Sequence, residues 1–189
     1  MKAYTSNNIR NIAVLGHGGK GKTTLCEAML YIAGASDRLG RVADGNTVLD
    51  FDSEEKRFEG GAAEAVRAAE AVLIVTSAGS GVDVGTEKAF RAAEKKGAAK
   101  FFAVTKTDSD HRNFYKTFDA LKEVYGNKLC PTIIPYMEGN ITKCYVNLMT
   151  GMAFSYDENG KATKVPVPED SVIEEMTSAF MEAVATTDD

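Results

Sequence analysis

The sequence has few cysteines and no long apolar run. Its three cysteines, Cys26, Cys130 and Cys144, lie far apart and lack the spacing of a metal site or a redox pair, which favours a reduced, cytoplasmic setting. No stretch approaches the roughly 18 consecutive apolar residues that a membrane-spanning helix needs, and the polar start has no apolar signal-peptide core. We therefore expect neither secretion nor membrane insertion.

Acidic residues outnumber basic ones. The chain has 22 Lys and Arg against 27 Asp and Glu, and its net charge of -5 argues against a protein held on nucleic acid by bulk electrostatics. We therefore predict no direct, specific binding to DNA, whereas a ribosomal protein partner stays compatible with this charge. The 189 residues, 44% of them hydrophobic, suffice for one globular domain with a small appendage.

The phosphate-binding motif G-x-x-x-x-G-K-[ST] is present at residues 16–23. It follows the apolar run 12–15 and precedes a helix-forming stretch, which is the context that this motif requires. Backbone N–H groups of such a loop, together with the positive end of the following helix, bind polyphosphate. We predict that Lys22 reaches the β- and γ-phosphates and that the Thr23 hydroxyl coordinates Mg²⁺. The remaining nucleotide contacts are expected from Gly16, His17, Gly18, Gly19, Lys20, Gly21 and Thr24.

Three side chains of this loop leave a choice of roles. His17 occupies a variable position of the motif, so a structural role is favoured over that of a general base. Lys20 either adds positive charge for phosphate or faces water. Thr24 either contacts the α-phosphate or is an ordinary residue of the first helical turn. The sequence alone leaves the choices at Lys20 and Thr24 open.

A second motif, Thr105-Lys106-Thr107-Asp108, follows the apolar run 101–104. Open α/β sheets bind ligands at the carboxyl ends of their strands. A carboxylate there can accept from the ring N–H and the exocyclic amine of guanine, and a Lys stem can lie over the base. The tetrad resembles the guanine-binding motif N-K-x-D, with Thr105 in place of Asn. We therefore predict that Thr105, Lys106 and Asp108 contact guanine.

Strands and helices alternate over the first 135 residues. Apolar runs predict buried strands at 11–15, 72–76 and 101–104, and helical periodicity predicts helices at 23–33, 61–71, 87–96 and 113–125. Right-handed crossovers between them give an α/β fold of the P-loop NTPase type, with a mostly parallel, doubly wound sheet. A last short strand at 132–134 is expected to complete this domain, residues 1–135. Residues 35–57 within it are expected to form a long exposed loop.

The pattern changes after residue 135. Residues 141–156 alternate as antiparallel strands do, a turn is expected at 157–160, and another strand at 161–167. A final helix is expected at 171–185, with Ser171 and Glu174 forming a capping box at its start. We predict that residues 136–189 form part of a small inserted α+β subdomain.

One component of a Mg²⁺-nucleotide site is missing from the sequence. Such a site requires an acidic residue at the end of an apolar strand near the phosphate loop. The strand at 72–76 continues into Ser77, and the strand at 101–104 leads into the tetrad, so neither strand supplies this carboxylate. No residue qualifies as a water-activating group either, and we therefore assign no catalytic residue.

The loop G-H-G-G-K-G-K-T-T, residues 41–52 and residues 58–61 together resemble elongation factor G and the elongation-factor-G-like proteins. The resemblance covers nearly the whole chain, in order. It implies the G domain of a cytoplasmic translational GTPase, which binds GTP or GDP with Mg²⁺ and whose full form acts on the ribosome in translocation or a related step. This chain would hold part of the G domain and part of its inserted subdomain.

The chain departs from this family between Arg57 and Phe58. In the family, the stretches that match these residues are separated by a switch segment that carries the metal-shell Asp and the water-positioning residue. Either this segment is deleted here or the numbering runs across it, and we favour the second explanation. If the segment is absent, we expect nucleotide binding with little or no hydrolysis. Two other functions stay open: an ATP-dependent kinase or ATPase, and a nucleotide-binding module that does not hydrolyse.

Overall fold

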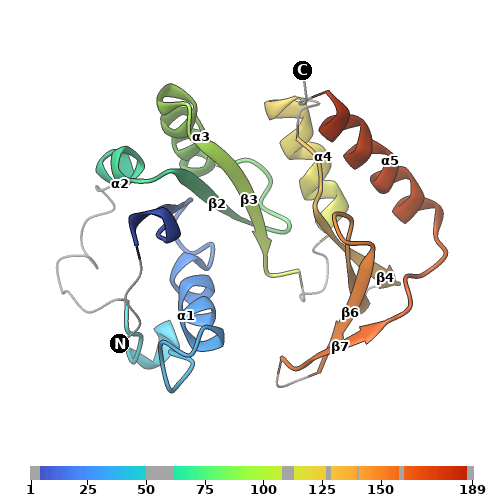
Figure 1. The fold of residues 1–189 in the computed structure, drawn as a ribbon, viewed down its shortest axis with the longest axis horizontal. Coiled ribbons are helices and arrows are strands. Elements are labelled where there is room, and N and C mark those ends of the chain that lie inside the picture. Colours follow the sequence, from blue (N-terminus) through green and yellow to red (C-terminus); the bar gives the residue numbers. More distant parts are fainter. Residues whose placement is uncertain are drawn as a thin grey trace. The chain divides into compact units, whose positions relative to one another are not determined.

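A computed structural model describes residues 5–49, 62–107, 113–126, 129–139, 141–157 and 160–186 (Figure 1). Contacts between Cα atoms divide the chain into two compact units, residues 1–105 and residues 106–189. The division into folding domains 1–135 and 136–189 is a separate hypothesis and stays a prediction.

The first unit is built on a three-stranded parallel sheet in the order β1-β2-β3. Its strands are β1 (Ile12–Leu15), β2 (Ala71–Ser77) and β3 (Ala99–Thr105), close to the three strands predicted for this region. The central strand β2 carries the continuous apolar run, and its Val72, Ile74 and Val75 are fully buried. This parallel sheet, with helices connecting its strands, confirms the predicted α/β class.

Three α-helices belong to the first unit: α1 (Lys22–Ile32), α2 (Ala62–Ala68) and α3 (Val84–Lys96). Helices α2 and α3 supply small side chains to the core of the sheet, which contains Ala13, Val66, Ala69, Val72, Ile74, Ala89, Ala93 and Ala98. The Lys96 ammonium donates to three backbone carbonyls at the end of α2, those of Val66, Arg67 and Ala69. A cation in this position satisfies carbonyls that lack helical partners, and it links α2 to α3.

Helix α3 begins three residues earlier than the sequence predicts. Asp83 is its N-cap, and the carboxylate accepts from the backbone N–H of Thr86 at 3.0 Å. Short polar side chains at this position stabilise the first helical turn. Gly97 ends the helix in the left-handed conformation, with φ of 73°, as its position in the sequence predicts.

The second unit contains a four-stranded antiparallel sheet in the order β4-β5-β6-β7. These strands are β4 (Ile133–Glu138), β5 (Ile141–Asn147), β6 (Met152–Tyr156) and β7 (Ala162–Val165). The sequence analysis placed the strand at 132–134 with the first sheet, and this was wrong, because β4 pairs with β5 and sets Ile134 opposite Val146. A short apolar run indicates a buried strand but does not reveal its partner.

Two helices, α4 (Phe114–Tyr125) and α5 (Ser171–Ala185), complete the second unit. Its core contains Ile134, Cys144, Val146, Leu148, Ala153 and Ile173. Cys144 and Val146 are alternate residues of β5, so they lie on one face of the sheet, in the same core as Ile173 of α5. The predicted capping box of α5 is wrong in its first residue, because the N-cap is Asp170, whose side chain accepts from Val172 N at 2.8 Å. No helix within the described ranges is long and apolar enough to cross a membrane.

Candidate phosphate-binding site

The motif at 16–23 forms the connection between β1 and α1, and its glycines explain the shape of this loop. Gly16, Gly19 and Gly21 have φ of 144°, 73° and 89°, which are values that side chains disfavour. A Cβ atom on Gly16 would also lie 2.2 Å from the carbonyl oxygen of Val75 on β2. Gly21 is the N-cap of α1, so the helix begins at Lys22 and its first backbone N–H groups face the loop.

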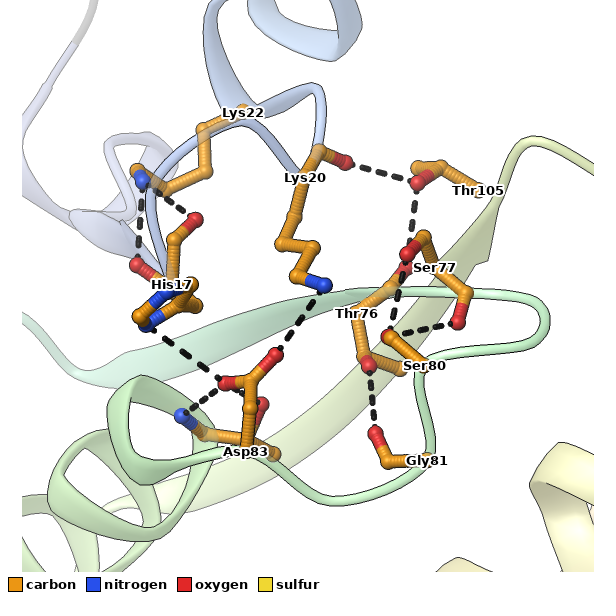
Figure 2. A network of polar contacts seen from close by, with 11 residues as sticks. His17, Lys20, Lys22, Thr76, Ser77, Ser80, Gly81, Asp83 and Thr105 are labelled. Atoms are coloured by element: carbon orange, nitrogen blue, oxygen red, sulfur yellow. Dashed lines mark hydrogen bonds and ion pairs between the residues drawn. The ribbon is translucent and has the colours of Figure 1, made fainter.

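Lys22 folds back over the loop that precedes it. Its ammonium donates to the carbonyl oxygen of Gly16 at 2.9 Å and to that of His17 at 3.0 Å (Figure 2). An ammonium has three N–H donors, so these two hydrogen bonds leave one for an anion. The next residue, Thr23, is half-buried in the first turn of α1, whereas Thr24 is exposed.

Lys20, whose role the sequence left open between phosphate and water, pairs with a carboxylate. Its Nζ lies 3.3 Å from Oδ2 of Asp83, and the two side chains are only 16% and 18% exposed. The geometry is that of an ion pair rather than of an aligned hydrogen bond. Figure 2 shows the Lys20 side chain extending from the loop toward Asp83 at the start of α3.

The surroundings of Asp83 favour its charged form. Burial raises the pKa of the carboxyl, but hydrogen bonds from N and Oγ1 of Thr86, together with the nearby Lys20 charge, outweigh burial and lower the pKa below its usual value. His17 contributes a weaker contact, because its Nδ1 is 4.0 Å from Oδ1 of Asp83 and its ring is half-exposed. The site therefore holds a carboxylate that neutralises part of the positive charge of the loop.

The first turn of α3 also touches the backbone of the loop. A Cβ atom on Gly85 would lie 2.6 Å from Cα of His17, so only glycine permits this approach. His17 thus lies against α3, and its role, structural or in nucleotide binding, stays a prediction. Neither Asp83 nor Gly85 was singled out from the sequence. An Asp three residues before Thr86 is a recognisable helix-capping pattern, and the expected helix start at residue 87 concealed it.

Thr105 connects the end of β3 to the phosphate loop. Its hydroxyl lies 2.7 Å from the carbonyl oxygen of Lys20 and 3.0 Å from that of Thr76. A hydroxyl has one hydrogen, so the two carbonyls share this donor. Lys106, which follows, has φ of 57° and is the one non-glycine residue with positive φ in the described part of the chain. Asp108 lies outside the described residues, as does the junction of Arg57 and Phe58.

The donor atoms near the loop fit a magnesium ion that arrives with a nucleotide. Within the described ranges, no group of three or more His, Cys, Asp or Glu side chains could hold a metal. The Thr23 hydroxyl stays the predicted protein ligand of the loop, and Mg²⁺ commonly takes its other ligands from phosphate oxygens and water. A metal site made by protein side chains alone does not fit these residues.

A parallel α/β sheet, a glycine-rich loop from the end of its first strand, and a lysine folded over that loop define a P-loop nucleotide-binding domain. Residues 7–59 match the family model of the elongation factor Tu GTP binding domain. An elongation factor G-like protein of Mycobacterium tuberculosis is 28% identical over 206 residues, which is 93% of this chain and 28% of the relative. An elongation factor G-like protein of Synechocystis is 26% identical over 220 residues, 100% of this chain and 33% of the relative.

A solved structure is also similar to this chain. The crystal structure of a Thermus thermophilus protein superimposes with a TM-score of 0.86 at 32% identity, covering 96% of this chain and 32% of that chain. These comparisons and the fold support a G domain similar to that of the elongation-factor-G-like translational GTPases. The chain spans about a third of the length of the relatives that it matches. The Synechocystis alignment covers 220 positions, 31 more than the 189 residues of this chain.

Proposed function

We propose that this chain binds GTP or GDP together with Mg²⁺, and that the full-length protein hydrolyses GTP during a step of translation on the ribosome, in the cytoplasm. The observation that supports this proposal most is the placement of Lys22, whose ammonium lies over the carbonyls of Gly16 and His17 with one N–H donor remaining. Phosphate oxygen is the acceptor that such a donor takes in a glycine-rich loop of this kind.

Each proposed contact has a defined place in the loop. The backbone N–H groups of residues 16–24 surround the phosphates, Lys22 binds the β- and γ-phosphates, and Thr23 binds Mg²⁺. Lys20 acts through its ion pair with Asp83, which reduces the positive charge available to phosphate. In the base-reading tetrad, Lys106 and Asp108 contact guanine. Thr105 acts indirectly, because its hydroxyl donates to the carbonyl of Lys20 in the loop.

Hydrolysis depends on residues that position water and on the charge around the γ-phosphate. None of the described residues near the loop is placed as a water-activating group. A bound Mg²⁺ would neutralise charge on the phosphates, and the residues named above would hold the nucleotide in position. We infer that this chain alone binds nucleotide and hydrolyses GTP slowly or not at all, whereas hydrolysis belongs to the full-length protein.

Nucleotide binding is tested by titrating a fluorescent GDP analogue with the wild-type chain and with Lys22→Ala. Loss of a charged hydrogen bond to phosphate is expected to weaken binding at least about tenfold, which corresponds to roughly 1.4 kcal/mol. Lys95→Ala on the exposed face of α3 is the matched control and should bind as the wild type does. Unchanged affinity in Lys22→Ala would instead favour a binding module whose nucleotide site is vestigial.

The choice of base is tested by competition and by substitution of Asp108. GTP should displace the bound GDP analogue, whereas ATP should not, because adenine lacks the pair of donors that a carboxylate accepts. Asp108→Asn should weaken guanine binding and shift preference toward xanthine nucleotides. Equal displacement by ATP and GTP would contradict the guanine assignment and favour an ATP-dependent enzyme.

A further inference from the structure

Glu27, in the middle of α1, is a buried charged residue without an ionic partner among the described side chains. It has 0% exposure, and the other buried polar residues of the described chain are Thr and Ser. Ionisable side chains are rarely buried completely, because removing a carboxylate from water is unfavourable unless hydrogen bonds replace the water. The contacts of Glu27 therefore need an explanation, and the phosphate contacts proposed above do not involve it.

The Glu27 carboxylate binds a segment more than twenty residues further along the chain. Its Oε1 accepts from the backbone N–H of Val48 at 2.8 Å and from that of Leu49 at 2.9 Å. Hydrogen bonds between a carboxylate and backbone N–H groups are among the stronger ones in proteins. Through these two bonds, α1 fixes the end of the loop formed by residues 40–49.

The start of the same loop packs against the second oxygen of Glu27. A Cβ atom on Gly40 would lie 2.2 Å from Oε2 of Glu27 and 2.9 Å from Cα of Thr47. Residue 40 must therefore be glycine while the carboxylate stays in place. The loop also closes on itself, because Arg41 N donates to Oδ1 of Asn46 at 2.7 Å. Both ends of the 40–49 loop thus surround one buried carboxylate.

Helix α1 connects this carboxylate to the phosphate loop. Lys22 and Thr23 form its first turn, and Glu27 lies about one turn further along the same 11-residue helix. A hydrogen-bonded helix of this length moves as one body, so a ligand that fixes its first turn also fixes Glu27. The proposed nucleotide contacts and the 40–49 loop therefore share one rigid element.

We propose that Glu27 is a positioning residue that couples the 40–49 loop to nucleotide occupancy of the phosphate loop. The inference rests on the proposed function, since the nucleotide is the ligand that would fix the first turn of α1. Bound nucleotide stabilises the hydrogen bonds of Val48 N and Leu49 N, and, by reciprocity, these bonds slow nucleotide release.

The link itself is tested without nucleotide, by NMR measurement of amide hydrogen exchange in the wild-type chain, Glu27→Gln and Glu27→Ala. Gln keeps an oxygen acceptor of the same reach, so Val48 and Leu49 amides should stay protected. Ala removes the acceptor, and exchange at these two amides should accelerate to the rate of exposed loop amides. Glu70→Ala is the matched control, because Glu70 is exposed and its side chain pairs with Arg10. Slow exchange that persists in a folded Glu27→Ala would overturn the link.

Coupling is tested by the dissociation rate of a fluorescent GDP analogue. The Glu27→Ala variant should release the analogue at least about fivefold faster than the wild type, because fivefold is the lower end of typical coupling between two sites. The Glu27→Gln variant should release it at about the wild-type rate. Gly40→Ala tests the same link without altering α1, because the added methyl group displaces the loop from Glu27. An unchanged release rate in folded Glu27→Ala and Gly40→Ala would overturn the coupling. Failure of the wild-type chain to bind guanine nucleotide would overturn the proposed function instead. The amide exchange rates would still show whether Glu27 holds Val48 N and Leu49 N.

Discussion

The two units of the chain bury different kinds of side chain. In the first unit the buried polar residues are Glu27, Thr76, Ser77 and Thr86, which lie on α1, at the end of β2 and in the first turn of α3. The second unit buries one described polar residue, Thr117, beside a core that is otherwise apolar. Buried polar groups add little net stability even when they are hydrogen-bonded. Their concentration near the phosphate loop therefore indicates that they position a binding site.

The core of the second unit shows packing away from the phosphate loop. Phe114 stacks on Phe118 with ring centroids 6.2 Å apart, and its ring meets that of Tyr115 edge to face at 5.4 Å. The Tyr115 hydroxyl donates to the carbonyl of Pro135 at 2.7 Å, which links α4 to β4. Aromatic and aliphatic contacts of this kind stabilise a fold and carry no specific chemistry. Substitutions in the core of the second unit should therefore change stability, whereas those that displace the phosphate loop should chiefly change binding.

The largest expected effect is on stability, from Ile134→Ala in β4. Ile134 is fully buried in the core of the second unit, so truncation should lower the free energy of unfolding by about 2–5 kcal/mol. Urea unfolding followed by circular dichroism measures this loss. Ile133→Ala is the matched control, because that neighbouring side chain is 51% exposed and should change stability by less than about 1 kcal/mol. Equal losses in the two variants would contradict the packing described for this sheet.

A smaller effect is expected from Gly85→Ala, which should change binding more than helix stability. Alanine favours a helix over glycine by roughly 1 kcal/mol, yet its methyl group would lie 2.6 Å from Cα of His17. The phosphate loop must move, and we expect affinity for the GDP analogue to fall about tenfold, in line with overpacking of roughly 1–3 kcal/mol. Val84→Ala, at a 63% exposed position of the same turn, is the control. Unchanged affinity in Gly85→Ala would show that the loop tolerates this displacement.

The phosphate loop could be predicted from the sequence because its motif is local. Three glycines with positive φ and a lysine that returns to the loop backbone lie within seven consecutive residues, so spacing alone identifies them. Asp83 and Glu27 could not be found in this way. Asp83 meets Lys20 from 63 residues away, and Glu27 meets Val48 from 21 residues away. A single sequence contains no record of such contacts.

Strand pairing and helix caps show the same limit. The helix at 171–185 was predicted with its observed bounds, because its apolar periodicity is strong, but its cap proved to be Asp170 rather than Ser171. The apolar run around Ile134 correctly predicted a strand, but the strand was assigned to the wrong sheet. Its pairing partner is β5, which follows it in the chain and which the run itself does not reveal. Local sequence preference determines whether a segment forms a helix or a strand. Which other segments it pairs with depends on the packing of the whole unit.

The smallest expected effect is that of Asp83→Asn, and it should depend on pH. Asn is as good an N-cap as Asp, so the substitution keeps the bond from Thr86 N and removes the charge that faces Lys20. At pH 7 the wild type should be more stable by about 0.2–1 kcal/mol, the usual range for a partly exposed ion pair. Because the pKa of Asp83 is lowered in the folded chain, its charge stabilises the fold above the unfolded pKa of about 3.9 and ceases to do so as the pH falls through the folded pKa.

The difference in unfolding free energy between the wild type and Asp83→Asn should therefore be constant above about pH 5 and shrink below about pH 4. Urea unfolding at pH 7, 5 and 3 measures it. Asp119→Asn in α4 provides the comparison in the second unit, because Asp119 is exposed and the described structure gives it no ion pair, so its difference should stay near zero throughout. If this difference in unfolding free energy instead grew as the pH falls, the effect of burial on the Asp83 carboxyl would outweigh that of its hydrogen bonds and of Lys20. The fold would then favour the neutral form of the carboxyl. The ion pair with Lys20 would then not be what fixes the loop against α3.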